Sequence, residues 1–418
     1  MLAQIVSKNY KIENSHTLEV ALKNGVYEAA KKGFTLGKEA ITDEVEKSGL
    51  RGKGGGGAAA GPKWRLVIKE EEPQKYLAIN CDESEPGTFK DRTILEQDPH
   101  LLIEGAILTC FAIGANHAYI YIRGEYVAQA DMMNAAIDEA YAAGILGEDV
   151  LGSGFKLDMT LHRGAGAYIC GEKTALLESL EGKRGHPRLK PKKPECEWYF
   201  GKPTLVNNVE TIASVPFIVG SGADAYRSYG TEKSPGTLLF AASGHINNPG
   251  VYEAPFGIKM IDYINEVCGG IKNGKKLKAV IPGGSSCAIL TAQEAEKVHL
   301  DYEDMRNYGS SLGTGGMIVM DESVDMVKAL KNLMEFYHHE SCGQCTPCRE
   351  GTGWVDKTLA RILEGSGSKE DIEILLENAD TMNGKTICVF APAVSGVIYS
   401  YLSKFRSEFE AYLEKSDV

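Results

Sequence analysis

The chain has 418 residues, of which 43% are hydrophobic, and a formal net charge of -12 at pH 7. This length allows two to four domains with real cores, and the negative charge argues against nucleic acid or an anionic membrane surface as a partner. No apolar run approaches the roughly 18 residues of a membrane span, and residues 1–20 lack the apolar core of a secretion signal. We expect a cytoplasmic protein, free or peripheral on a membrane-bound complex, that binds no nucleic acid and is not inserted directly into a membrane.

The chain alternates helices and short strands up to residue 235. We assign each element from the period of its hydrophobic residues and from its flanking glycines. The expected helices are Leu18 to Lys32, Gly37 to Ser48, Leu101 to Ala115 and Val127 to Ala143. The expected strands are Tyr76 to Asn80, Ala118 to Ile122 and Phe155 to Leu161.

A glycine-rich loop, Arg51-Gly-Lys-Gly-Gly-Gly-Gly-Ala-Ala-Ala-Gly-Pro-Lys63-Trp64, follows the second helix. Residues without side chains let the backbone approach a ligand and point N–H groups at an anion. Arg51, Lys53 and Lys63 add positive charge. A flexible linker is the alternative, but the flanking basic residues and the Trp favour a phosphate site.

An acidic turn, Asn80-Cys-Asp82-Glu83-Ser-Glu85-Pro-Gly-Thr, comes directly after the first strand. Ligands of open α/β sheets bind at the carboxyl ends of the strands. An Asn and three carboxylates at such a place could hold ribityl hydroxyls or the edge of a ring. The alternative is a solvated turn that caps the helix after it.

Two further polar turns follow. The first, Gly164-Ala-Gly-Ala-Tyr168-Ile-Cys-Gly171-Glu172-Lys173, is a strand–glycine turn–helix unit whose helix N-terminus can face a ligand. A basic loop comes next, with Lys183, Arg184, Arg188, Lys190, Lys192 and Lys193. The second turn, Asn207-Asn208-Val-Glu-Thr211, opens another helix. Paired Asn side chains suit a heteroaromatic edge, although they also serve as helix caps.

Residues 236 to 322 read as a small α+β unit. Its expected elements are strands at Gly236 to Ala242, Leu277 to Ile281 and Gly313 to Asp321, and a helix at Ile258 to Cys268. The segment Gly283-Gly-Ser-Ser could bind phosphate. No basic residue adjoins it, so we interpret it as a turn.

The last part of the chain is helical and carries a cysteine run. The expected helices, Val324 to His339, Thr352 to Gly365, Lys369 to Met382 and Val394 to Leu413, suggest a four-helix bundle. Three cysteines stand in a C-x2-C-x2-C run, and a fourth lies far downstream: Cys342, Cys345, Cys348 and Cys388. Structural zinc prefers two separated pairs, whereas a triplet plus a remote cysteine suits a [4Fe–4S] cluster. The six other cysteines lack ligand spacing and are expected to be buried, reduced thiols.

With these motifs the chain resembles the NADH-oxidising flavoprotein subunit of respiratory complex I and its homologues in soluble NAD(P)-linked hydrogenases and formate dehydrogenases. The likeness covers nearly the whole chain. It implies a Rossmann-like FMN-binding α/β domain at residues 1–235, a ubiquitin-like β-grasp (SLBB) domain at 236–322, and a helical bundle carrying a [4Fe–4S] cluster at 323–418. The cluster ligands would be the four cysteines.

The resemblance also implies the FMN site. Together with the charged residues of the loops, the candidate cofactor-binding residues are Arg51, Gly52, Lys53, Gly54, Gly55, Lys63, Asn80, Asp82, Glu83, Glu85, Tyr168, Gly171, Glu172, Lys173, Lys190, Asn207, Asn208 and Thr211. Glu85 and Glu172 would position the flavin and the nicotinamide, because hydride transfer needs no protein acid or base.

The implied activity is electron input. A hydride passes from NAD(P)H to FMN, single electrons pass to the [4Fe–4S] cluster, and partner subunits receive them, or the flow runs in reverse. The implied partners are a thioredoxin-like [2Fe–2S] subunit and a larger iron–sulfur subunit in a hetero-oligomeric complex. The alternative function is a non-catalytic wiring subunit that has lost nicotinamide turnover.

The chain departs from the family pattern in the part that would hold the dinucleotide. Ala58 and Leu66 replace aromatic residues, Lys173 replaces the second Glu of a Gly-Glu-Glu turn, and Lys190-Pro-Lys192-Lys193 replaces Lys-Pro-Pro-Phe. A carboxylate at the adenosine ribose favours NAD over NADP, so the reversed charge at Lys173 could favour NADPH. NADH, NADPH and neither cofactor remain open at this point.

Overall fold

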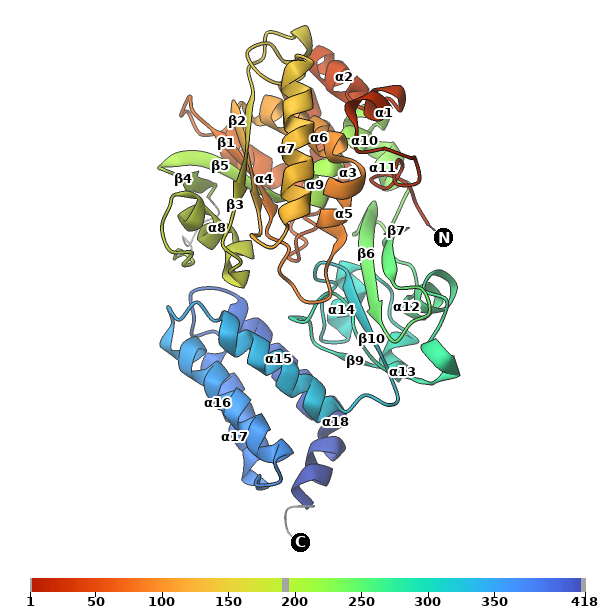
Figure 1. The fold of residues 1–418 in the computed structure, drawn as a ribbon, viewed down its shortest axis with the longest axis vertical. Helices are drawn as coiled ribbons and strands as arrows, with labels where there is room; N and C mark the ends of the chain where they lie inside the picture. The colour runs from red at the N-terminus through yellow and green to blue at the C-terminus, as the bar shows by residue number, and fades with distance from the viewer. Residues whose placement is uncertain (1, 190–194, 415–418) are drawn as a thin grey trace.

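The computed structural model describes residues 2–189 and 195–414, and it consists of three units in chain order (Figure 1). The first unit is an α/β domain, the second is a small domain with its own sheet, and the third is a bundle of four helices. This confirms the predicted fold class. Lys190, Lys192 and Lys193 lie outside the described residues. Among the described helices, none has both the length and the apolar character needed to cross a membrane.

The first sheet has the strand order β3-β2-β1-β5-β4. Its strands are β1 Tyr76–Cys81, β2 His117–Ile122, β3 Asp158–Arg163, β4 Glu197–Tyr199 and β5 Lys202–Asn208. All pair in parallel except β4, which runs antiparallel to β5. The next strand in the chain, β2, lies on one side of β1, and the later strand β5 lies on the other side. The carboxyl ends of β1 and β5, where Asn80 pairs with Asn208, therefore form the switch point at which α/β sheets bind ligands.

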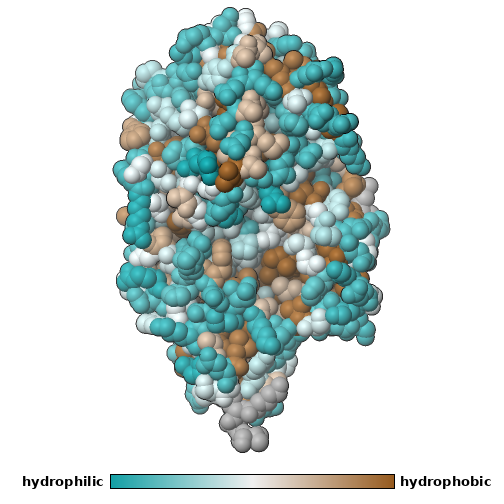
Figure 2. Space-filling view, viewed as in Figure 1, coloured by the Kyte–Doolittle hydropathy of each residue, from teal (hydrophilic) through white to brown (hydrophobic). Residues whose placement is uncertain are grey.

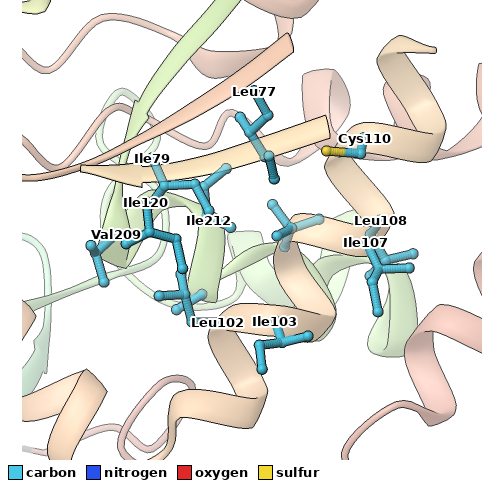
Figure 3. Close-up of a cluster of buried hydrophobic side chains, with 14 of the residues drawn as sticks. Leu77, Ile79, Leu102, Ile103, Ile107, Leu108, Cys110, Ile120, Val209 and Ile212 are labelled. Atoms are coloured by element: carbon cyan, nitrogen blue, oxygen red, sulfur yellow. The ribbon is translucent and has the colours of Figure 1, made fainter. Parts of the chain in front are cut away.

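Helices cover this sheet. They are α1 Leu18–Lys23, α2 Glu28–Leu36, α3 Lys38–Ser48, α4 Ala60–Ile68, α5 Lys90–Gln97, α6 Pro99–Ile113, α7 Val127–Ala142, α8 Lys173–Leu180, α9 Val209–Ala213, α10 Val215–Ser221 and α11 Ala223–Arg227. Short 3-10 turns lie at Val150–Gly152 and Tyr168–Gly171. Figure 3 shows Leu77 and Ile79 of β1 and Ile120 of β2 with α6 side chains such as Leu102 in one buried cluster. A strand buried on both faces is apolar throughout, which explains the short apolar run of β1.

The predicted helix Leu18 to Lys32 is in fact two helices, α1 and α2. Tyr27 lies between them with φ +76°, a left-handed conformation, and its side chain is fully buried. Its hydroxyl group stands 2.7 Å from His100 Nδ1, and the Ala30 N–H donates to Glu104 at 3.0 Å. Contacts with α6 thus override a helical pattern that looked continuous.

The second unit contains the sheet β7-β6-β10-β8-β9. Its strands are β6 Thr237–Gly244, β7 Gly250–Pro255, β8 Leu277–Ile281, β9 Leu290–Thr291 and β10 Gly316–Asp321. Its helical turns are α12 Met260–Asp262, η3 Tyr263–Val267, η4 Lys272–Gly274, α13 Ala292–Ala295 and α14 Tyr302–Asn307. Only β6 and β10 pair in parallel, at the centre of the sheet. This parallel centre with antiparallel flanks agrees with the predicted β-grasp unit.

The third unit packs four helices against the first two units. They are α15 Met326–Glu340, α16 Thr346–Leu363, α17 Glu370–Met382 and α18 Phe390–Glu414. A single hydrophobic core joins this bundle to α8, to Val206 of β5, and to Ile281 and Ile289 of the second unit. Figure 2 shows a mainly hydrophilic face on which hydrophobic residues lie in several separate groups, one of them at mid-height.

Candidate functional site

A cavity of about 410 Å³ lies at the carboxyl ends of β1 and β5, and all three units line it. We call it the interdomain cavity. Its walls include Ser286 and Thr314 of the second unit and Phe390 of the third. Many of the residues predicted to bind a cofactor line it as well. They are Gly54, Gly55, Asn80, Asp82, Glu83, Glu85, Tyr168, Gly171, Glu172 and Asn208.

The glycine loop is folded back on itself and is not a linker. The Gly52 N–H donates to the Ala58 carbonyl at 2.8 Å, which closes the loop. A Cβ on Gly54 would stand 3.0 Å from the Cβ of Asn208, so a larger residue would push these two segments apart. Because the loop lacks side chains at this point, its backbone forms part of the cavity wall.

Arg51 and Lys53 anchor the glycine loop instead of facing the cavity. Arg51 Nη1 pairs with Glu303 of α14 at 2.6 Å. Lys53 is fully buried, with Nζ 2.8 Å from Ser214 Oγ and 3.2 Å from a Glu210 oxygen. Both charges are therefore engaged within the protein, which leaves the phosphate role predicted for them to other groups.

Three further predicted residues, Thr211, Lys63 and Asn207, do not line the cavity, although Asn207 adjoins the lining residue Asn208. Thr211 Oγ1 accepts a hydrogen bond from the Lys53 N–H at 2.9 Å. Lys63 Nζ donates to the Val206 carbonyl at 2.9 Å, and it forms no ion pair with the described residues. Burial is the main cause that lowers the Lys63 pKa to about 8, and Lys173 lowers it further. Asn207 Nδ2 is buried with no partner among the described residues. A cation without a carboxylate and an N–H group without an acceptor fit a polar, anionic cofactor such as FMN.

The acidic turn has two roles in the structure. The Glu83 carboxylate accepts the Asp91 N–H at 2.7 Å and the Arg92 N–H at 3.1 Å, so it caps α5. The alternative interpretation is therefore right about the cap, but Glu83 is buried and not solvated. Asp82 and Glu85 line the interdomain cavity. Burial raises the pKa of both Asp82 and Glu83 to about 7, and it raises the pKa of Glu85 as well. Burial thus favours the protonated, neutral form of these carboxyl groups.

Glu172 and Asn208 both act as helix caps while lining the cavity. The Glu172 carboxylate accepts the N–H groups of Thr174 and Ala175 at the start of α8. The free helix N-terminus that the sequence suggested is therefore already occupied by a side chain. Asn208 accepts the Glu210 N–H at 3.0 Å, and its amide donates to Asp91 at 2.6 Å.

Lys173, at the first position of α8, is paired. Its ammonium group forms an ion pair with Glu197 of β4, the edge strand of the first sheet. The Lys173 side chain is 39% exposed and that of Glu197 is 21% exposed. The positive charge that distinguishes this chain from the family pattern is thus balanced by a neighbouring carboxylate.

The four cysteines of the predicted cluster line one small hollow at the end of the bundle, which we call the cysteine hollow. Cys342 and Cys345 lie in the loop between α15 and α16, Cys348 lies in the first turn of α16, and Cys388 precedes α18. Two helix N-termini therefore face the hollow and favour an anionic group. In the described part of the chain, no three His, Cys, Asp or Glu side chains converge as ligands of one ion would. Four cysteine thiols around one hollow are the ligand set that a [4Fe–4S] cluster requires.

The interdomain cavity and the cysteine hollow share a wall. Ile169, Cys388 and Phe390 line both spaces. Phe390 is 7% exposed and packs its ring 5.8 Å from that of Tyr168. Sequence reasoning missed Ile169 and Phe390 because an apolar residue carries no sign of which cavity it separates.

Three family models match the chain. Residues 45–217 match the Nuo51 FMN-binding domain, 238–319 the SLBB domain, and 328–412 the NADH-ubiquinone oxidoreductase-F iron-sulfur binding region. Each matched range falls within one of the three predicted segments.

Known proteins resemble the whole chain. An NADH-quinone oxidoreductase subunit of Rickettsia bellii (strain OSU 85-389) is 49% identical over 403 residues, covering 96% of this chain and 97% of the relative. Its counterpart in Rickettsia rickettsii (strain Sheila Smith) is 48% identical over 407 residues, covering 97% and 96%. A crystal structure of NAD+-reducing [NiFe]-hydrogenase in the air-oxidized state superposes with a TM-score of 0.85 and 36% identity, covering 95% of this chain and 67% of that chain. The chain therefore belongs to the family of NADH-quinone oxidoreductase subunits that combine the Nuo51 FMN-binding domain with the oxidoreductase-F iron-sulfur binding region.

Proposed function

We propose that this chain is an electron-input flavoprotein subunit that oxidises NADH through FMN in the interdomain cavity and passes electrons to a [4Fe–4S] cluster in the cysteine hollow. The wall shared by the two spaces carries the proposal. Cys388 lines both, so a ligand of the cluster reaches the edge of the flavin site. When bound, FMN accepts two electrons as a hydride and releases them singly, which a one-electron cluster requires.

Several residues of the chain would hold FMN. The backbone at Gly54 and Gly55 lines the cavity. The half-buried Lys63 ammonium group and the buried Asn207 Nδ2, next to the lining residue Asn208, would be further donors to anionic or carbonyl oxygens. Asn80 stands at the switch point, where its Nδ2 already donates to the Gly171 carbonyl at 2.8 Å. This bond joins the turn after β1 to the turn before α8. Asn80 Oδ1 accepts a hydrogen bond from the Asp82 N–H at 3.1 Å.

The residues around the cysteine hollow would hold the cluster and exclude water. The Ile387 N–H lies 3.4 Å from Cys345 Sγ, and Ser341 Oγ lies 3.3 Å from Cys348 Sγ. Hydrogen bonds to the sulfurs and the apolar side chains of Ile169 and Phe390 are two means by which a protein adjusts a cluster potential.

The ion pair of Lys173 supports NADH as the substrate. A free lysine at this position would attract the 2′-phosphate of NADPH. Glu197 neutralises Lys173, and it places a carboxylate near the position where the family pattern has one. We therefore favour NADH over NADPH. A protein that binds neither nucleotide is one of the outcomes that the experiment below distinguishes.

The chain is a subunit of a larger complex, as its membership of the family shows. We propose a thioredoxin-like [2Fe–2S] subunit and a larger iron–sulfur subunit as its partners, with the chain at the periphery of the assembly. The direction of flow depends on the acceptor, because one structural relative is named an NAD+-reducing hydrogenase.

An anaerobic titration tests the function. The purified protein loaded with FMN is titrated with NADH and then with NADPH, while flavin absorbance is followed at ~450 nm. We expect bleaching by stoichiometric NADH and little by NADPH. Bleaching by neither would leave the wiring subunit without nicotinamide turnover as the better description.

A further inference from the structure

The segment Gly283 to Cys287 of the second unit lines the interdomain cavity. From the sequence it is interpreted as a turn with no further role. Gly283, Ser286 and Cys287 all line the cavity, although they are about two hundred residues from the acidic turn in the chain. We call Gly283 to Cys287 the serine loop. Its position raises the question of what it does to the residues opposite.

The serine loop donates hydrogen bonds to the Glu85 carboxylate. The Ser286 N–H donates to Glu85 Oε1 at 2.6 Å. On the other side, the Tyr168 hydroxyl group donates to Glu85 Oε2 at 2.6 Å. The Ser285 hydroxyl group also donates to Glu85 Oε1, at 3.5 Å. Both oxygens of this carboxylate are therefore fixed by donors, Oε1 by the second unit and Oε2 by the first.

Only glycine fits at position 284. Gly284 has φ +104°, and a Cβ there would stand 2.4 Å from Glu85 Cγ. The absent side chain thus lets the loop lie directly against Glu85. A methyl group at this place would have to displace either the loop or the carboxylate.

The serine loop is itself held in place. The Gly284 N–H donates to the Gly316 carbonyl of β10 at 2.7 Å, and the Ser285 N–H donates to the Pro86 carbonyl at 3.1 Å. Ser285 Oγ stands 2.6 Å from the Tyr337 hydroxyl oxygen of α15. The loop therefore links all three units at the edge of the cavity.

We propose that the serine loop is a positioning element of the flavin site, which fixes the Glu85 carboxylate and so sets the affinity and reduction potential of the bound flavin. This inference rests on the proposed function. Burial raises the Glu85 pKa, whereas N–H and O–H donors favour the charged form. A fixed negative charge beside the flavin opposes its gain of electrons. Loss of the hydrogen bonds to Glu85 is therefore expected to make the flavin easier to reduce.

The test compares two glycine variants of the second unit. Gly284→Ala places a methyl group against Glu85. Gly274→Ala is the matched control, because Gly274 also has positive φ, at +65°, but faces open space. FMN is titrated into flavin-depleted protein by fluorescence quenching, and the midpoint potential of the loaded protein is measured. We expect Gly284→Ala to weaken FMN binding by about tenfold, since small misplacements in a site have large effects, and to shift the potential to a more positive value. Gly274→Ala should change neither quantity.

Two further variants keep the test decisive if Gly284→Ala folds poorly. Ser285→Ala removes the hydroxyl group that contacts Tyr337 and should shift the potential in the same direction by a smaller amount. In a Glu85→Ala background, Gly284→Ala should have no further effect, because the two changes act through one contact. Equal effects of Gly284→Ala and Gly274→Ala, or an undiminished effect of Gly284→Ala without Glu85, would overturn the positioning role. A wild-type protein that binds no FMN would instead refute the proposed function.

Discussion

The cysteine hollow and the interdomain cavity adjoin each other, yet different kinds of side chain line them. The hollow takes its thiols from the loop between α15 and α16, the start of α16 and the segment just before α18, with apolar neighbours such as Ile169. The cavity takes its walls from all three units and is rich in carboxylates whose pKa values burial raises. Covalent ligands fix a cluster whatever the surrounding charge. A flavin bound without covalent ligands depends on charges that other units hold in place, so it is the more easily disturbed of the two sites.

The largest expected effect is at the cysteine hollow. Changing Cys345 to Ser should abolish the cluster, because thiolates are the ligands that iron–sulfur clusters need. Iron and acid-labile sulfide per chain measure the loss. Cys268→Ser is the control, since Cys268 is buried in the second unit, away from the hollow. Full retention of iron after substitution of all four predicted ligands would refute the cluster site.

The second prediction concerns the wall that the two spaces share. Phe390→Ala should lower the free energy of unfolding by about 3 kcal/mol, as expected for truncation of a buried aromatic residue. It should also admit water between the cofactors. Urea denaturation measures the first effect. Phe200→Ala is the control: Phe200 is 63% exposed, so a change below about 0.5 kcal/mol is expected. Equal losses in both variants would contradict the position of Phe390.

The third prediction tests the ion pair between Glu197 and Lys173, the residue that follows the cavity-lining Glu172 in the chain. Lys173→Glu should shift the preference towards NADH, and Glu197→Gln should free the lysine and shift it towards NADPH. Each change is expected to alter the ratio of kcat/KM values by about tenfold, the effect of roughly 1.4 kcal/mol of differential binding. Initial rates with both nucleotides give this ratio. An unchanged ratio in both variants would separate Lys173 from nucleotide selection.

The smallest effect concerns how the stability of protein prepared without FMN depends on pH. The Asp82 pKa is about 7 in the folded chain, against about 3.9 when unfolded. The folded state thus retains a proton that the unfolded state has lost, so this group's contribution to stability falls as the pH rises from about 4 to about 7. Asp82→Asn removes that titration.

The stability of Asp82→Asn relative to wild type should therefore rise over this pH range and stay constant above it. We expect a change of roughly 1 kcal/mol, because water in the flavin-free cavity screens the charge. Chemical denaturation at pH 4.5, 6 and 8 (about the limits set by the two pKa values) measures the difference. A difference that does not vary with pH would show that Asp82 does not titrate in this range.

The sequence predicted those parts of the site whose spacing reflects local geometry. The cysteine run and the polar residues after β1 and before α9 are such cases. The carboxyl ends of neighbouring parallel strands lie at the same edge of a sheet, so residues that follow these strands come close together. Lys53 and Arg51 show the limit. Both flank a glycine loop and look like phosphate ligands, but Glu210 and Glu303, distant in sequence, engage them. Only the tertiary structure decides which partner a charge meets.

The serine loop shows a second limit. Without a neighbouring basic residue, Gly283-Gly-Ser-Ser has no sequence feature that points to Glu85, since the contact joins segments that follow strands of two different sheets. The break between α1 and α2 has the same origin, because Tyr27 bonds to His100 of α6. In both cases, contacts between remote segments decide what the local pattern leaves undetermined.

The hydrophobic core that joins the bundle to α8 and to Ile281 has a consequence for how the molecule can be divided. Although three family models divide the chain, a cut near residue 323 would split one core and expose apolar surface on both fragments. The units are thus separate modules in sequence, whereas the bundle shares its core with parts of the other two units, so we expect its stability to be coupled to theirs. Exchange of a single unit between relatives would require that the matching half of the core be exchanged with it.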